Sequence, residues 1–106
     1  MAYIRLSVMT PRRGQREELE RALRQLAEFH ATQAGHWFTL RVESRGEGGT
    51  IGRITAWNDE ASADAAARAT HDQSLRSRLN QLVEGHEHLE RSFFGELVSG
   101  TLPEGA

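Results

Sequence analysis

The sequence predicts an α+β domain of the ferredoxin-like βαββαβ type, in which a four-stranded antiparallel sheet carries the helices on one face. Four segments alternate apolar and polar residues, which is typical of strands with one dry face. Two longer segments repeat apolar residues at spacings of three and four, which is typical of amphipathic helices. Their order along the chain is strand, helix, strand, strand, helix, strand, and this order predicts the topology.

The first half of the chain supplies a strand, a helix and a second strand. Residues 3–9 alternate and end before a proline, which cannot donate to a strand ladder. Residues 14–34 carry one apolar stripe and predict a helix. Gly35 is placed to end that helix in the left-handed backbone conformation. Residues 36–43 alternate again and predict the second strand.

The third strand is expected over residues 50–57. The glycine-rich stretch 44–49 joins it to the preceding strand and predicts a hairpin. Asn58 or Asp59 then provides a helix N-cap, because short polar side chains accept hydrogen bonds from the first turn.

The second helical region is predicted in two parts. The first part runs to Ala69, and the spacing of Thr70 and Gln73 fits a capping box that restarts the helix after a kink. Gly85 is expected to close it. The last strand is predicted over residues 89–98.

Composition limits the class of protein. The 106 residues suit one domain, with residues 1–99 folded and 100–106 as a flexible tail. The net charge of −2 argues against nucleic-acid binding. The absence of cysteine excludes disulfides, a thiolate nucleophile and cysteine-ligated metals. No apolar run suits a membrane span, and no signal peptide is evident, so a cytoplasmic protein is expected.

One face of such a sheet lies under the helices, and the other needs a cover. The predicted uncovered face carries Met9, Trp37, Ile51 and Trp57, some of Phe93, Phe94 and Leu97, the arginines Arg5, Arg41 and Arg53, and Ser7, Thr39 and Thr55. Two tryptophans and several aliphatic residues make a large apolar patch for a monomer. The sequence therefore predicts a homodimer formed through the open sheet face, and the mixed lining suits a ligand cavity.

Several stretches carry a resemblance to a known family. They are the opening strand 3–9, the Ala34-Gly35-His36-Trp37 helix exit, the stretch Ile54-Thr55-Ala56-Trp57-Asn58-Asp59-Glu60-Ala61, the region of His71, and the closing Glu90-Arg91-Ser92-Phe93-Phe94. Over residues 2–98 the chain resembles the antibiotic biosynthesis monooxygenase-like family of the dimeric α+β barrel superfamily. This family includes cofactor-independent quinol monooxygenases and haem-degrading monooxygenases.

The resemblance implies a cofactor-independent monooxygenase that oxidises an aromatic, quinol-type small molecule in a cavity between sheet and helices. Trp57 would hold a planar substrate, or else anchor the strand-to-helix corner. Asn58 would be a polar pocket residue, or else a helix cap. His71 would be the general base, since histidine titrates near neutral pH, or else a half-exposed helix start.

Five further residues are expected to contact the substrate. Donors such as Arg53, Arg41 and Asn58 would stabilise a substrate anion. Together the expected substrate-binding residues are Trp57, Arg53, Arg41, Trp37, Ser7 and Phe94.

Neither haem nor a metal ion is expected. The haem-degrading pattern has an asparagine in the first strand and a tryptophan in the second helix, where this chain has Ser7 and the run 65–67 of alanines. His86 and His88 could bind a metal, but a solvated loop is the simpler interpretation.

Two other functions stay open. One is a non-catalytic ligand-binding or stress-related protein of the same fold. The other is a lyase or isomerase that acts on small ring compounds, since one fold hosts many chemistries.

Overall fold

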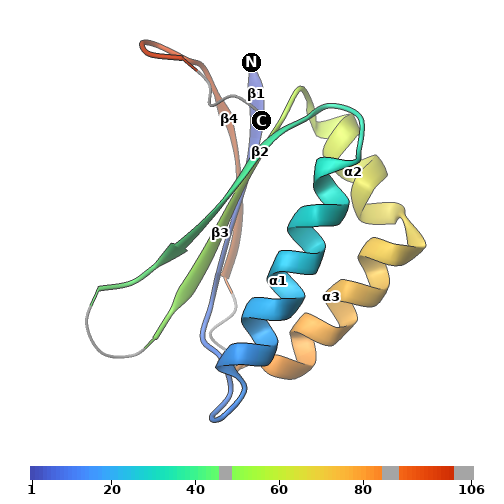
Figure 1. Cartoon of the computed structure of the whole chain (residues 1–106). Helices are drawn as coiled ribbons and strands as arrows, with labels where there is room; N and C mark the ends of the chain where they lie inside the picture. The colour runs from blue at the N-terminus through green and yellow to red at the C-terminus, as the bar shows by residue number, and fades with distance from the viewer. Residues whose placement is uncertain (46–48, 85–88, 102–106) are drawn as a thin grey trace.

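A computed structural model of the chain describes residues 1–45, 49–84 and 89–101. Its elements, in chain order, are β1 (Ala2–Met9), α1 (Arg16–Ala31), β2 (His36–Glu43), β3 (Ile51–Trp57), α2 (Glu60–Arg68), α3 (Thr70–Leu82) and β4 (Leu89–Gly95) (Figure 1). The predicted βαββαβ order is confirmed, with the second helical region split into α2 and α3.

The four strands form one antiparallel sheet in the order β2-β3-β1-β4. Figure 1 shows all the helices on one side of this sheet, with α1 and α3 lying side by side across it. β2 is irregular at its start, where the pairing shifts between His36 and Phe38. No helix in the described part of the chain is long and apolar enough to cross a membrane.

The helix ends follow the sequence in two cases. Gly35 takes a φ of +84° between α1 and β2, which confirms the predicted left-handed position. The Asp59 side chain accepts a hydrogen bond from the Ser62 backbone N–H at 2.8 Å and caps α2. Of the two candidate caps, Asp59 therefore does the capping.

The capping box predicted at Thr70 is wrong. The extended residue that precedes α3 is Ala69, and no side chain caps this helix. Thr70 is already helical, so its hydroxyl is not in the position that faces the free N–H groups of the first turn. The last strand also ends early, at Gly95. Gly85 lies outside the described residues.

The two faces of the sheet are the reverse of the prediction. Met9, Ile51 and Trp57 are buried under the helices, with exposed fractions of 2% or less. The face without helices carries the aliphatic and aromatic residues Ile4, Leu6, Val8, Phe38, Leu40, Val42, Ile54, Leu89 and Phe93. Apolar residues occur on both faces of the sheet, and alternation along the strands alone does not say which face the helices cover.

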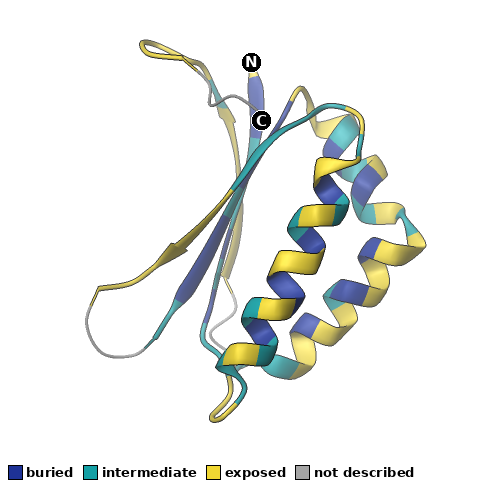
Figure 2. Ribbon diagram, viewed as in Figure 1, coloured by how far each residue is buried: buried dark blue, intermediate teal, exposed yellow. Residues whose placement is uncertain are grey.

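The helix-covered side holds two separate core clusters. One joins Met9 and Ile51 to leucines of α1 and α3, and the other joins Tyr3 and Trp57 to alanines of α2. Figure 2 shows the buried stripes of α1 and α3 facing each other and the sheet, whereas much of β2 and β4 is exposed. The space between the clusters is occupied by polar residues.

Gly35 should be among the most sensitive positions in the fold. A β-carbon added there would lie 2.6 Å from the Ser62 β-carbon, and the positive φ disfavours any side chain. We expect Gly35→Ala to lower the free energy of unfolding in urea by about 2–4 kcal/mol. Gly14→Ala is the matched control, because φ is +77° there but nothing lies within 4 Å of the added carbon. Equal losses in the two variants would contradict the close approach to Ser62.

Candidate active site

A row of polar side chains crosses the helix-covered face of the sheet. The strand register places Arg41 of β2, Arg53 of β3, Ser7 of β1 and Glu90 of β4 opposite one another. Directly paired residues point to the same side of a sheet. The row therefore runs under the helices, between the two core clusters.

Arg53 is the most deeply buried cation of the row, with an exposed fraction of 6%. Its Nη2 donates a long hydrogen bond of 3.5 Å to the Ser7 hydroxyl, and its Nε has no partner in the described part of the chain. Burial, together with the positive charge of Arg76, lowers the pKa of Arg53 to about 10. The guanidinium nevertheless stays charged at neutral pH.

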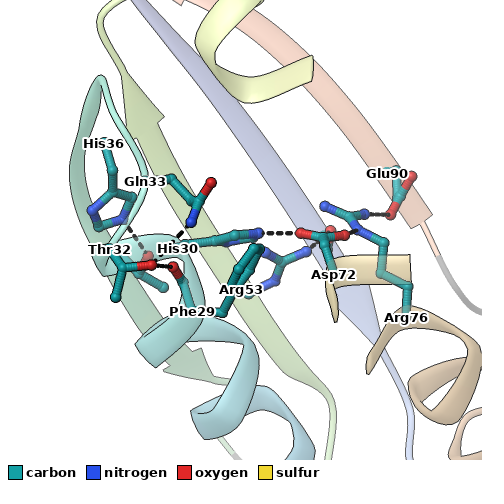
Figure 3. A network of polar contacts seen from close by, with 11 residues as sticks. Phe29, His30, Thr32, Gln33, His36, Arg53, Asp72, Arg76 and Glu90 are labelled. Atoms are coloured by element: carbon teal, nitrogen blue, oxygen red, sulfur yellow. Dashed lines mark hydrogen bonds and ion pairs between the residues drawn. The ribbon is translucent and has the colours of Figure 1, made fainter. Parts of the chain in front are cut away.

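A buried network of polar contacts lies beside Arg53 (Figure 3). His30 of α1 and Asp72 of α3 meet through Nε2 and Oδ2 at 2.6 Å, and both are almost fully buried. The other carboxylate oxygen of Asp72 accepts a hydrogen bond from Nε of Arg76. Nη1 of Arg76 lies 3.8 Å from a carboxylate oxygen of Glu90. The network therefore connects α1, α3 and β4.

The charges of the network follow from its environment. Burial lowers the pKa of His30, and the hydrogen bond to Asp72 only partly offsets this effect. Burial alone would raise the pKa of Asp72, but the hydrogen bonds from His30 and Arg76 and the charge of Arg76 outweigh it, so this pKa is lowered. At neutral pH a neutral His30 therefore donates from Nε2 to an ionised Asp72. Its Nδ1 has no partner among the described residues.

Trp57 packs beside the buried network at the end of β3 and does not line the three cavities described below. Its ring meets the rings of His30 and His36 edge-on, with centroids 5.3 Å and 5.1 Å apart. Its indole N–H is buried without a partner in the described part of the chain. Edge-on packing on two imidazoles holds the ring firmly.

Two adjoining cavities open between α3, β1, β3 and β4. The larger measures about 400 Å³ and is lined by Met9, Arg53, Arg76, Leu79, Asn80 and Glu90. The second measures about 250 Å³ and shares Arg53, Arg76 and Glu90 with it. Because these three residues border both cavities, they lie at the centre of the combined space.

The residues predicted from the sequence separate into two groups. Arg53 borders both cavities, and Ser7 lines the smaller one. Arg41 lines a third cavity of about 170 Å³ on the α1 side, where Arg53 also contributes. Arg41 is engaged by carboxylates there, at 3.0 Å from Glu20 and 2.5 Å from Glu43.

Four other predicted residues lie elsewhere. His71 is exposed, and its ring packs edge-on against Phe29 at 5.0 Å. Trp37 donates its indole N–H to the Asn58 side chain, away from the buried network. Phe94 is 65% exposed at the sheet edge. None of these four borders the two α3-side cavities of the described residues, and their predicted roles stay predictions.

The buried network itself was not predicted. His30 lies on the apolar stripe of α1, where a histidine is usually part of the core, and Asp72 directly follows His71, the predicted general base. Asp72 and Arg76 do have the i, i+4 spacing of a helical ion pair. That spacing was the available signal for a charge cluster on α3.

No metal centre is evident in what the structure describes. Residues 1–45, 49–84 and 89–101 contain no group of three or more histidine or carboxylate side chains that could hold an ion. His86 and His88 lie outside the described residues.

A four-stranded antiparallel sheet with its helices on one face defines the ferredoxin-like class of α+β folds. Within this class the chain belongs to the antibiotic biosynthesis monooxygenase family, whose family model matches residues 2–78. This match confirms the resemblance found in the sequence. A search among curated proteins finds no match.

Solved structures show the same fold. SnoaB, a cofactor-independent oxygenase from Streptomyces nogalater, superimposes with a TM-score of 0.80 at 20% identity, covering 97% of this chain and 98% of that one. A conserved protein from Methanosarcina mazei superimposes with a TM-score of 0.83 at 14% identity, covering 91% of this chain and 94% of that one. Rv0793 from Mycobacterium tuberculosis superimposes with a TM-score of 0.80 at 14% identity, covering 91% of this chain and 96% of that one. At these identities the likeness concerns the fold.

Stability should depend on pH through His30. Burial lowers the pKa of His30 in the folded chain, so below about pH 6.5 the unfolded chain binds a proton that the folded chain resists. The free energy of unfolding should therefore fall as the pH drops from 7.5 to 5.5. The pKa of Asp72 is lowered from a value near 4, so the contribution of this carboxylate to the free energy of unfolding is lost only at more acidic pH.

The variant His30→Gln separates this contribution, since its amide can still donate to Asp72 but does not titrate. Urea unfolding between pH 5.5 and 7.5 should give it a shallower slope than the wild type. A residual slope is expected from His36, whose pKa burial also lowers. An unchanged slope would rule out His30 as the source.

Proposed function

We propose that this protein is a cofactor-independent monooxygenase that oxidises an electron-rich aromatic compound of the anthrone or quinol type. The observation that carries the proposal is the 400 Å³ cavity, whose wall combines apolar Met9 and Leu79 with two arginines and a carboxylate. An apolar wall suits a fused ring, and fixed cations suit the anion that such a ring forms before it reacts with oxygen. Family membership and the fold shared with SnoaB support the same reaction class.

In the proposed reaction of an anthrone, the ring methylene becomes a carbonyl. The carbon loses two hydrogens and gains one atom of O2, and the two hydrogens leave with the second oxygen atom as water. In a quinol, a ring C–H carbon becomes C–OH with one atom of O2, and the two phenolic hydrogens leave with the second oxygen atom as water, which gives a hydroxyquinone. The substrate anion supplies the electrons, so the substrate itself reduces oxygen. What the protein must supply is a proton acceptor and a stabiliser of the negative charge.

Arg76 and Glu90 are suited to these two tasks. Both border the cavities, and Nη1 of Arg76 lies 3.8 Å from the Glu90 carboxylate. Glu90 can take the proton of the reacting group, and Arg76 then faces the charge that remains. The carboxylate of Asp72 fixes Nε of Arg76, and His30 fixes Asp72, so the guanidinium is held in place before the charge develops.

Oxygen uptake with a panel of anthrones and naphthoquinols tests the proposal. We expect the wild type to consume oxygen with at least one of them, and Arg76→Met or Glu90→Gln to lower kcat by about 10- to 1000-fold. Arg78→Met is the matched control, because Arg78 lies on the exposed side of the same helix and pairs with Glu18 at 2.7 Å. Absence of uptake by the wild type on the whole panel would contradict the proposal for these substrates.

We also propose that the protein works as a homodimer through the open sheet face. Leu40, Val42, Leu89 and Phe93 are between 39% and 51% exposed there, beside the partly exposed Ile54. Burying a sheet face of aliphatic and aromatic side chains away from water is favourable, and a second copy provides a matching surface through a two-fold axis.

The mass in solution tests the dimer. Light scattering at micromolar concentration should give twice the chain mass for the wild type and the monomer mass for Leu40→Glu, because a carboxylate would have to be buried between the two sheets. Gln25→Glu, on the exposed side of α1, is the control and should stay dimeric. A wild-type monomer would contradict the dimer.

A further inference from the structure

We infer that Arg53 is a binding site for a carboxylate that the substrate carries in addition to its reacting ring. The inference deepens the proposed function, since it concerns the same cavity and names a substrate class: aromatic acids. Arg5, Arg41 and Arg53 project from this face of the sheet and differ in their partners.

The neighbours of Arg53 are neutralised within the chain. Arg5 lies 2.6 Å from the Asp64 carboxylate, and Arg41 is paired with Glu20 and Glu43. Arg53 is more buried than either, yet in the described part of the chain its guanidinium forms no ion pair. Its single hydrogen bond there is the 3.5 Å contact with the Ser7 hydroxyl.

A buried cation without a counterion is costly, because the charge has lost its water and gained little in return. The nearby carboxylates lower this cost through space but are otherwise engaged. Asp72 bonds His30 and Arg76, and Glu90 lies beside Arg76 with a side chain that is 57% exposed. An anion brought by a ligand would supply the partner that the fold does not.

The position of Arg53 suits such a ligand. It borders the 400 Å³ and 250 Å³ cavities, and the 170 Å³ cavity on the α1 side as well. Its Nη2 is held only by the 3.5 Å contact with Ser7, and its buried Nε adds an unsatisfied donor to the same cation in the described part of the chain. Guanidinium donors in a planar fork match the two oxygens of a carboxylate, which favours this anion over a single phenolate oxygen.

The ligand would then be held at two points. Its carboxylate meets Arg53 at the sheet, and its ring extends along Met9 and Leu79 toward Arg76 and Glu90. The inner arginine would select the substrate and the outer pair would act on it. Binding and turnover are therefore expected to depend on different residues.

Two probes of nearly equal shape test this inference. They are 1-hydroxy-2-naphthoate and its uncharged amide, 1-hydroxy-2-naphthamide, titrated calorimetrically into the full chain without oxygen at pH 7.5. The acid should bind the wild type about 10- to 100-fold more tightly than the amide, which is the range for a buried hydrogen bond to a charged group. Arg53→Met should bring this ratio close to one, Arg53→Lys should keep part of it, and the control Arg78→Met should leave it unchanged.

The wild-type ratio is informative even if Arg53→Met fails to fold. Equal affinities of acid and amide for the wild type would overturn the inference, as would a preference that survives in folded Arg53→Met. The result is also separate from the oxygenase test. Acid preference without oxygen uptake would support a carboxylate site in a protein that is not an oxygenase, and oxygen uptake without acid preference would overturn the carboxylate site alone.

Discussion

The placement of α1 and α3 over the sheet depends on the buried carboxylate of Asp72. It takes a hydrogen bond from His30 of α1 on one oxygen and from Arg76 of its own helix on the other. A carboxylate without water needs such partners, so α1 and α3 must lie at the distance and rotation that bring them to it. Helix packing by leucines alone tolerates small shifts, whereas a 2.6 Å contact does not. The two helices are thereby fixed over the sheet, and with them the wall of the cavity.

The polar row across the sheet explains why the core is divided. Arg53 and Ser7 occupy the middle of β3 and β1, where a continuous apolar layer would otherwise join the Met9 cluster to the Trp57 cluster. Dividing the core reduces the apolar area that each helix can bury, and a chain of this length has little to spare. Such an arrangement is unfavourable for stability and is understandable where polar groups must face a cavity.

Much of the fold follows from local patterns, and the site does not. The strands, the helices and the turn at Gly35 depend on residues a few positions apart, which periodicity reveals. The pair of His30 and Asp72 joins positions 42 residues apart, and no local pattern reports such a contact. The neighbouring His71 shows how fine the distinction is: successive residues on a helix point about 100° apart, so one side chain is exposed and the next is fully buried. Local patterns likewise do not identify the face of the sheet that the helices cover, because apolar residues occur on both faces and the more continuous apolar set lies on the open one.

The alternation that obscured the two faces also links them. Along β1 and β3, successive residues point to opposite faces of the sheet, as with Ser7 on the cavity side and Val8 on the open face, or Arg53 and Ile54. The backbone that positions the Arg53 guanidinium is therefore the same backbone that a second sheet would press against. Close packing transmits small displacements instead of absorbing them. If two copies associate through Ile54 and its neighbours, the partner would set the curvature of β3, and hence the depth at which Arg53 lies in the cavity. In this fold, self-association and ligand binding would use opposite faces of the same strand, so one would affect the other.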